Sequence, residues 1–156
     1  DIFKGDATLY CAYLILLHAF DSYRTVKWQT EWLSRELDGV VYGDLTSPES
    51  YSSMNKKQSG LYSQLIYTHD RNWRMGVRYD TIYQNDITKD GVDIDEVDDF
   101  DKYSAMIEYH TSEFARFRLQ YNYNKAMYNE DEERENLHTI MLQANIAIGA
   151  HAAHAF

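Results

Sequence analysis

Charged residues spaced two or four apart are the most specific chemical feature of this chain. Arg74 and Arg78 share one parity of a segment that alternates polar and apolar residues, and Arg116 and Arg118 do the same in a second segment. Side chains at such spacings project from one face of a strand. A face with several arginines around enclosed water favours anion passage, and interspersed carboxylates moderate that preference. We therefore predict a pore wall, completed by Lys27, Glu31, Arg35, Asp80, Glu108 and Gln120.

The same charges also have a structural interpretation. Opposite charges on neighbouring strands can pair across a sheet and hold it rigid, with little net stabilisation where water screens them. Rigidity and selectivity are compatible, so both interpretations stay open.

An acidic stretch at 86–101 raises the question of a cation site. The spacing of Asp86, Thr88, Asp90 and Gly91 resembles the start of an EF-hand loop, but Val97 stands where that loop needs a bidentate Glu. A solvated charge run explains the stretch more simply, with a weak divalent-cation site as the alternative.

Histidines late in the chain raise the same question for zinc. His110, His138, His151 and His154 would come from different heights and faces of a sheet. We therefore predict no metal site and no cofactor.

Signatures of common enzymes are absent from the sequence. It has no G-x-S-x-G, H-E-x-x-H, P-loop or dinucleotide fingerprint. A lipid hydrolase built on a barrel would need Ser and His together on the lipid-facing wall, whereas Ser104 and His110 share the polar parity. We predict that the protein is not an enzyme.

The elements that must position these residues have the pattern of β-strands. Polar and apolar residues alternate in five segments, and two further apolar-rich segments are less regular. An aromatic content of 15%, with 14 Tyr and a single Pro, also favours strands. We expect seven strands, near 7–16, 26–33, 61–69, 73–80, 103–110, 115–124 and 139–148.

The connections between these segments alternate in length. Short turns are expected at 18–24, 69–72 and 111–114, and long polar loops at 38–60, 85–102 and 128–136, the first holding a short hairpin strand at 40–45. Short turns at one rim and long loops at the other are typical of up-and-down barrels in outer membranes.

Aromatic residues lie toward the ends of the expected strands. Trp73 and Phe117 are near turns, whereas Tyr79, Tyr83 and Tyr121 are nearer the long loops. Membrane barrels concentrate aromatics at the two interfaces, and each strand needs only about 9–11 residues to cross. A soluble sandwich would instead spread its aromatics through a core.

Composition excludes several other classes. A formal net charge of −10 argues against nucleic-acid binding, and the single cysteine, Cys11, excludes internal disulfides. Mean hydropathy is −0.59, and the longest apolar run, 11–17, is too short for a spanning helix. The start at Asp1 lacks the features of a signal peptide, so we expect one to be absent or removed.

Several segments together resemble a known family. These segments are 28–33 (WQTEWL), 60–65 (GLYSQL), 71–80 (RNWRMGVRYD), 112–121 (SEFARFRLQY) and 142–156 (LQANIAIGAHAAHAF). With them, the sequence from about Arg24 onward resembles the C-terminal part of Gram-negative outer-membrane barrels called porin-like proteins or zinc-regulated TonB-dependent outer-membrane receptors. The resemblance implies an outer-membrane location, solute transport, and contact with outer-membrane lipid, lipopolysaccharide and the barrel-assembly machinery.

The final residue supports the same interpretation. Phe156 keeps the parity of Ile140 and Ile148 and is expected to be the assembly signal in the last strand. With a periplasmic C-terminus, the long loops would be extracellular and Asp1 would lie outside the cell. Bacterial barrels have even strand numbers, so we expect the C-terminal portion of a larger barrel.

These observations predict an all-β, antiparallel up-and-down transmembrane β-barrel formed by one domain, 1–156, without a plug domain. The expected function is an outer-membrane channel for passive or weakly selective passage of small solutes through a charged lumen. The alternatives are a ligand-gated receptor or transporter whose plug lies elsewhere, a soluble β-sandwich binding module, and a structural barrel without a conducting pore. Homo-oligomerisation stays open.

Overall fold

The protein folds into one antiparallel β-sheet. The structure, a computed structural model, describes residues 2–42, 51–94, 100–128 and 134–147. These residues contain eight strands and no helix, and therefore no helix long and apolar enough to span a membrane. The strands are β1 (Ile2–Ala19), β2 (Thr25–Tyr42), β3 (Tyr51–Thr68), β4 (Trp73–Lys89), β5 (Val92–Ile94), β6 (Phe100–Ser112), β7 (Ala115–Tyr128) and β8 (Arg134–Ile146).

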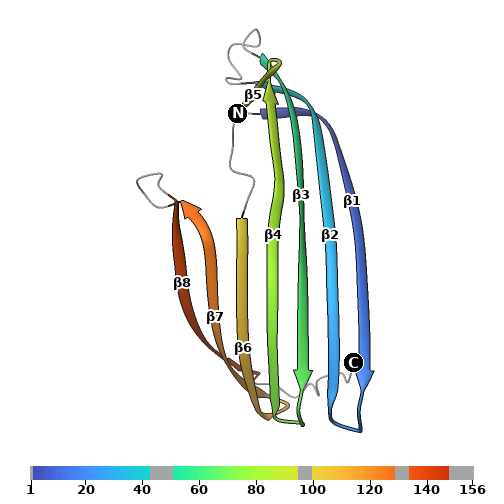
Figure 1. Ribbon diagram of the computed structural model, residues 1–156, viewed down its shortest axis with the longest axis vertical. Helices are drawn as coiled ribbons and strands as arrows, with labels where there is room; N and C mark the ends of the chain where they lie inside the picture. Colours follow the sequence, from blue (N-terminus) through green and yellow to red (C-terminus); the bar gives the residue numbers. More distant parts are fainter. Residues whose placement is uncertain (1, 43–50, 95–99, 129–133, 148–156) are drawn as a thin grey trace.

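The strands are ordered as an up-and-down meander. Seven long strands follow the path β1-β2-β3-β4-β6-β7-β8, and the short β5 pairs with the far end of β4. Figure 1 shows these strands side by side in one curved sheet, with the short turns after β1, β3 and β6 at its lower end. Within the described residues, β1 pairs only with β2 and β8 only with β7, so the sheet is not closed into a barrel.

The predicted strands and short turns are confirmed, but the bounds of the predicted long loops are wrong. The turns occupy 20–24, 69–72 and 113–114. Most of 38–60 and parts of 85–102 and 128–136 belong to strands, and the predicted hairpin strand at 40–45 begins as the end of β2. The long strands have 13 to 18 residues, more than a bilayer crossing needs. These extensions could not be predicted from alternation, because polar residues stand at both odd and even positions there.

Strand register defines two faces of the sheet, because directly paired residues project to the same side. One face, which we call the polar face, contains the odd-numbered residues of β2 and β8 and the even-numbered residues of β3, β6 and β7. On β4 it contains the even-numbered residues from Arg74 to Ile82. The opposite set forms the apolar face. The separation of the two kinds of side chain predicted from sequence therefore holds across β2 to β8 in the part of the sheet nearest the short turns.

Two rows of rings cross the apolar face. The turn-side ring row is formed by Trp73, Tyr109 and Phe117, and the far-side ring row by Tyr79, Tyr103, Tyr123 and His138. Ring centroids are 4.6 Å apart for Trp73 and Tyr109, and 5.0 Å apart for Tyr79 and Tyr103. Between the rows lie mainly aliphatic residues: Met75, Ile107, Leu119 and Leu142, then Val77, Ala105, Tyr121 and Ile140.

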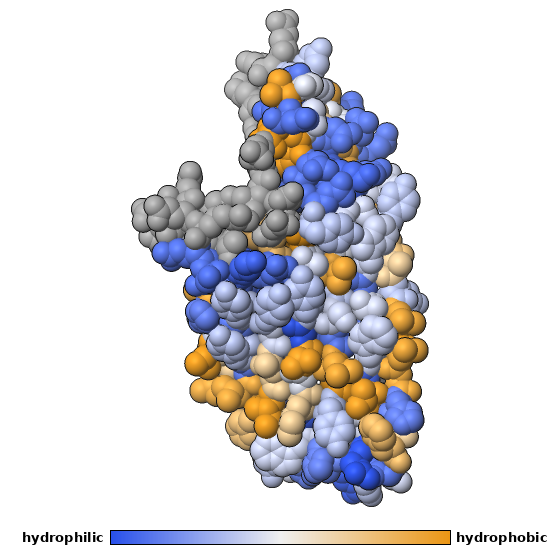
Figure 2. Space-filling view, viewed as in Figure 1, coloured by the Kyte–Doolittle hydropathy of each residue, from blue (hydrophilic) through white to orange (hydrophobic). Residues whose placement is uncertain are grey.

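No second layer of described residues covers these side chains. Val77 is 57% exposed, Leu119 46% and Leu142 83%, and the only apolar side chain that is buried within the described residues is Ile87. Figure 2 shows a hydrophobic band across the lower half of the molecule, with hydrophilic surface toward the upper end. The described sheet therefore has no sandwich core.

A β-bulge interrupts β4 above this band. The register shifts between Ser59 and Gly60, so Tyr83 has no direct partner on β3. A Cβ on Gly60 would lie 2.6 Å from the carbonyl oxygen of Thr81, so the close approach of the two strands requires glycine here. Ser34, Ser59 and Gln84 form one row across β2, β3 and β4. We call the part of these three strands from this row to the ends opposite the short turns the far half. The rest of the sheet, nearer the short turns, is the turn half.

Candidate pore wall

All ten residues predicted to line a pore lie on the polar face. Cross-strand pairing places Arg74 beside Glu108 and Glu108 beside Arg118, nearest the turns. Successive rows of pairs toward the far half contain Lys27 and Gln120, then Arg78, then Glu31 and Asp80, and finally Arg35. Arg116 pairs with His110 beside the turn after β6.

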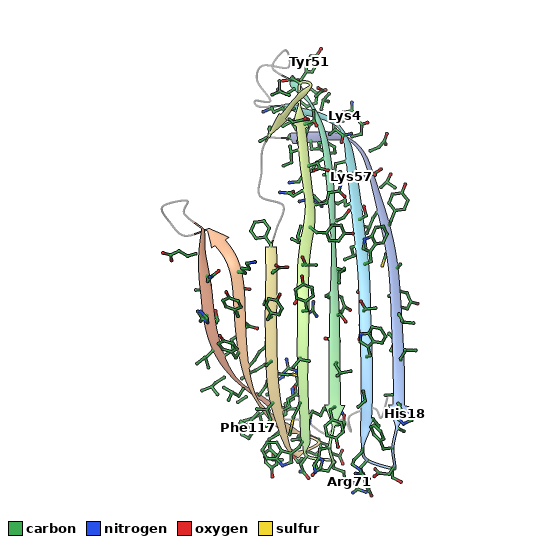
Figure 3. All side chains as sticks on the ribbon, viewed as in Figure 1. Lys4, His18, Tyr51, Lys57, Arg71 and Phe117 are labelled. Carbon is green, nitrogen blue, oxygen red and sulfur yellow. The ribbon has the colours of Figure 1, made fainter. Side chains whose placement is uncertain are left out.

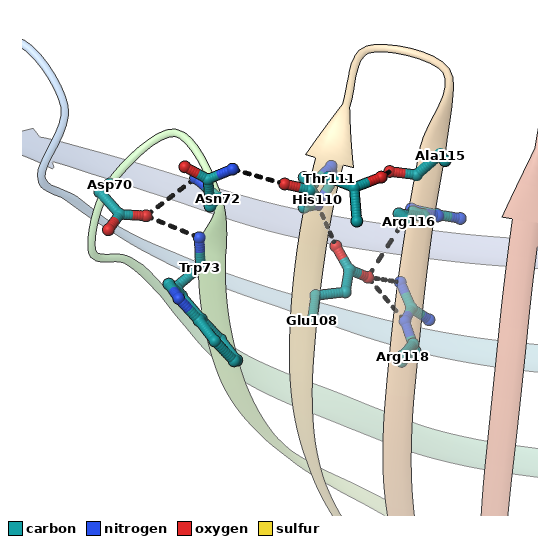
Figure 4. A network of polar contacts seen from close by, with 9 residues as sticks. All are labelled: Asp70, Asn72, Trp73, Glu108, His110, Thr111, Ala115, Arg116 and Arg118. Carbon is teal, nitrogen blue, oxygen red and sulfur yellow. Dashed lines mark hydrogen bonds and ion pairs between the residues drawn. The ribbon is translucent and has the colours of Figure 1, made fainter.

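Glu108 is the centre of a charged cluster on β6 and β7. Its side chain is 2% exposed, and its Oε2 accepts a hydrogen bond from Arg118 Nε at 2.6 Å. Arg118 Nη2 forms a second contact with Oε2, and Arg116 Nη1 lies 3.7 Å from the same oxygen. The other oxygen, Oε1, is 2.9 Å from His110 Nε2 (Figure 4).

This cluster supports the rigid-wall interpretation for part of the face. A buried carboxylate is costly unless charged groups and hydrogen bonds surround it, and Glu108 has two arginines and the ring of His110 beside it. The neighbouring turn adds to the framework, because Asn72 donates its side-chain N–H to the carbonyl oxygen of His110 at 2.7 Å. Arg74 differs, since no ion pair joins it to any described residue although it shares a row with Glu108.

A second ionic group lies in the middle of the face. Arg78 donates two hydrogen bonds to Asp80, from Nε at 2.8 Å and from Nη2, and its guanidinium lies 4.0 Å from the centroid of the Tyr62 ring. Tyr62 in turn accepts a hydrogen bond from Gln29 Nε2 at 2.8 Å. These contacts link β2, β3 and β4 and fix the direction of Arg78.

The remaining predicted residues have fewer ionic contacts. Arg35 donates from Nη2 to Gln58 Oε1 at 2.6 Å, and Gln58 donates to Asn85 Oδ1 at 2.8 Å. Lys27 forms no ion pair within the described segments. Of the predicted set, Lys27 and Arg74 are therefore available to a mobile anion.

A hollow of about 430 Å³ opens on the polar face between these groups, and we call it the polar hollow. Three cations line it: Arg78 from β4, Lys102 from β6 and Arg118 from β7. Its polar lining is completed by Gln64, Asp80, Ser104 and Gln120.

Sequence reasoning did not include three of the residues that now matter here. Lys102, Ser104 and Gln64 were left out of the predicted wall, although each has the parity that cross-strand pairing puts on the polar face. Lys102 falls where a long loop was predicted. Extending the alternation of β6 by one residue toward its start would have found it.

The acidic residues and histidines considered as cation ligands are spread apart where the structure describes them. No three His, Cys, Asp or Glu side chains gather there to hold a metal ion. Asp90 and Gly91 form the tight β4–β5 hairpin, where both have positive φ, and Asp90 Oδ1 accepts a hydrogen bond from the Ser53 amide at 2.7 Å. His151, His154, Phe156 and residues 95–99 lie outside the described residues.

Aspartates hold two of the three short turns at the lower end. Asp21 accepts hydrogen bonds from the amides of Tyr23 and Arg24, and these bonds lower the pKa of Asp21 to about 2. Asp70 does the same for Asn72 and Trp73, which lowers its pKa. Arg71 donates to the Tyr23 hydroxyl at 2.7 Å and thereby joins two turns; Figure 3 places Arg71 at the lower end with His18 and Phe117.

Comparison with known proteins gives one informative match. No family model matches the chain, and no solved structure is detectably similar to it. The chain is 39% identical over 154 residues to an uncharacterized protein of Aquifex aeolicus. That match covers 99% of this chain but only 32% of the relative, so the chain spans about a third of the length of the curated relative that it matches.

Proposed function

We propose that this sheet is part of the wall of an outer-membrane β-barrel that conducts small solutes through a charged, water-filled lumen. The polar face would line the lumen and the apolar face would contact lipid. Under this proposal, solutes pass passively or with weak selectivity set by pore width and wall charge.

The observation that carries the proposal is the distribution of burial between the two faces. In a water-soluble sheet the apolar side chains are buried and the charged ones are exposed. Here Glu108 is 2% exposed and Asn122 4%, whereas Val77, Leu119 and Ile140 are among the exposed residues. Other charged residues of the polar face, among them Arg74 and Arg78, are exposed. An uncovered apolar face opposite a face of charged side chains is favourable where lipid contacts the first and enclosed water contacts the second.

The ring rows support the same environment. Trp and Tyr combine an apolar ring with a polar group, so they are favoured at the two borders of the hydrocarbon layer. Trp73 and Tyr79 are six residues apart on one strand, which is about 20 Å of extended chain. The aliphatic residues between the two rows then correspond to the hydrocarbon.

The far half fits water on both sides. On the face that is apolar in the turn half, it has Ser34, Glu36, Lys57, Ser59 and Gln84, with Lys57 Nζ 3.0 Å from Glu36 Oε1. Ions facing lipid are expensive, so these rows would project beyond the bilayer. Figure 3 shows Lys57 well above Phe117 along the sheet.

A working barrel would need partners for both sheet edges. In lipid, unpaired backbone N–H and C=O groups cost several kcal/mol each, so open edges do not persist there. The long relative has ample length outside the matched region for further strands, and additional copies of the chain are the other source. In either case the expected location is the outer membrane of a Gram-negative bacterium.

Conductance of the full-length protein tests this proposal. The protein, purified in detergent and added to a planar lipid bilayer, should produce stepwise currents, and its gel mobility should change on heating. A heat-denatured sample is the matched control. Purification as a soluble protein without detergent would overturn the membrane proposal, and membrane insertion without current would overturn the channel function alone.

A further inference from the structure

The polar hollow is lined by three cations, and one of them, like a nearby hydroxyl group, has no hydrogen-bond acceptor among the described residues. Lys102 and Ser104 both line the hollow, and neither side chain has a hydrogen bond or an ion pair with another described residue. Arg78 and Arg118 are held in place by Asp80 and Glu108, respectively. The hollow thus has fixed arginines on two sides and a free ammonium group on β6 between them.

On the turn side of the hollow, the polar face has more cations than carboxylates. Between the hollow and the turns, the polar face adds Lys27, Arg74 and Arg116, and Glu108 is the only carboxylate on those rows of the described strands. The whole chain has a net charge of −10, so this local excess of cations runs against the overall composition. Such an excess raises the local concentration of anions.

The size and chemistry of the hollow suit a solute with an oxyanion group. A volume of about 430 Å³ holds a small organic anion or a hydrated phosphate. Guanidinium groups match the geometry of carboxylate and phosphate oxygens, and an ammonium group adds a point charge that can turn toward the ligand. A cation would meet three like charges here, with Asp80 already paired to Arg78.

We infer that the polar hollow is a binding site for solutes that present a phosphate or carboxylate group, with Arg78 and Lys102 as the principal contacts and Ser104 as an additional donor. The inference rests on the proposed channel function and names its preferred substrate class. Lys27, Arg74 and Arg116 would concentrate such anions at the turn side of the site.

Two measurements on the full-length protein test this inference separately from the channel. The first is the reversal potential in a KCl gradient, followed by titration of inorganic phosphate and, in a second arm, succinate, to detect block of the chloride current. The second is calorimetric binding of the same two anions to the detergent-solubilised protein, which needs no current. Anion selectivity together with binding of at least one anion is expected.

Lys102→Gln is the decisive variant, because it removes a charge that no described residue neutralises. It should weaken phosphate or succinate binding about fivefold, the effect of one unit charge in a wet site. Lys57→Gln removes the same charge on the other face, in the far half, and should leave affinity unchanged. Arg78→Gln should weaken binding as well, and Arg78→Lys should restore part of it.

The outcomes separate the two proposals. Absence of current with normal anion binding would overturn the channel and keep the site. A conducting protein that is cation-selective, or that binds neither anion, would overturn the site and keep the channel. Equal loss of affinity in Lys57→Gln and Lys102→Gln would indicate a response to overall charge and would also overturn the site.

Discussion

The turn half and the far half of the sheet are built from the same strands but differ in how their faces are divided. In the turn half, Val77 and Leu65 lie on one face and Arg78 and Gln64 on the other. In the far half this division is lost, with Lys57 and Asp86 on the first face and both Lys56 and the buried Ile87 on the second. Backbone pairing is continuous through both halves, so the strands do not end where their amphipathic pattern ends.

This difference indicates what each half is built to contact. An aliphatic band between two ring rows is suited to hydrocarbon, whereas an ionic outer surface is suited to water. The bulge at Tyr83 lies where one pattern gives way to the other. If the halves have these environments, a substitution of the same kind should have very different costs in the two.

The largest expected effect is that of a charge placed in the aliphatic band. Val77→Arg should destabilise the protein in lipid vesicles by about 2–4 kcal/mol, the cost of Arg near the bilayer midplane. Asn55→Arg, on the same parity in the far half, should change stability by less than about 0.5 kcal/mol. Urea titration of vesicle-inserted protein measures both, and similar costs for the two would remove the distinction between the halves.

A nearly equal effect is expected within the polar face of the turn half. Arg118→Ala removes the closest partner of a carboxylate that is 2% exposed, so it should cost about 3 kcal/mol. Arg74→Ala on β4 removes a guanidinium without an ion pair in the described part of the chain and should cost less than about 0.5 kcal/mol. Comparable losses in the two variants would show that Glu108 does not organise the wall.

A substitution at the β-bulge, where the two halves meet, should reduce stability even though the position is partly exposed. Gly60→Ala places a methyl group 2.6 Å from a backbone oxygen at the bulge, which should cost about 1–3 kcal/mol. Ser63→Ala, on the same strand, loses only the hydroxyl that accepts from Trp28 Nε1 at 2.9 Å and should cost about 1 kcal/mol. Unfolding midpoints of both variants test whether the bulge is needed; a neutral Gly60→Ala would show that it is not.

The smallest effect is expected at the turns. The folded-state pKa of Asp21 is about 2, below the ~3.9 of an unfolded Asp, so its charged form stabilises the fold above pH ~4 and this contribution is lost as the pH falls toward 2. Asp21→Asn keeps an acceptor for the two amides but loses the charge. The difference in thermal midpoint between variant and wild type should therefore shrink from pH 5 to pH 2, and a constant difference would contradict this assignment.

The structure of the turn half could be predicted from the sequence, whereas that of the far half could not. In the turn half, residues such as Arg118 and Leu119 alternate cleanly, so their strands, turns and faces were all predictable. In the far half, β2 and β3 place polar and apolar residues on both parities, and a bulge shifts the register by one residue. Periodicity has no signal there, and the strands were mistaken for loops.

The contacts within the site could be predicted only in part. Shared parity was enough to place Glu108 and Arg118 on one face, but which cations neutralise Glu108 depends on register and rotamers. The polar hollow depends on register in the same way, because it combines Gln64, Arg78, Lys102 and Gln120 from four different strands. No single segment contains that information.

The environment of the two faces can be measured directly with neighbouring cysteines. Leu119→Cys and Gln120→Cys, each in a Cys11→Ala background, place a thiol on opposite faces of β7 one residue apart. In the bilayer-inserted full-length protein, a charged, water-soluble thiol reagent should modify Gln120→Cys and leave Leu119→Cys unreacted. Rapid modification of Leu119→Cys, or equal modification of both, would contradict the assignment of the apolar face to lipid and the polar face to water.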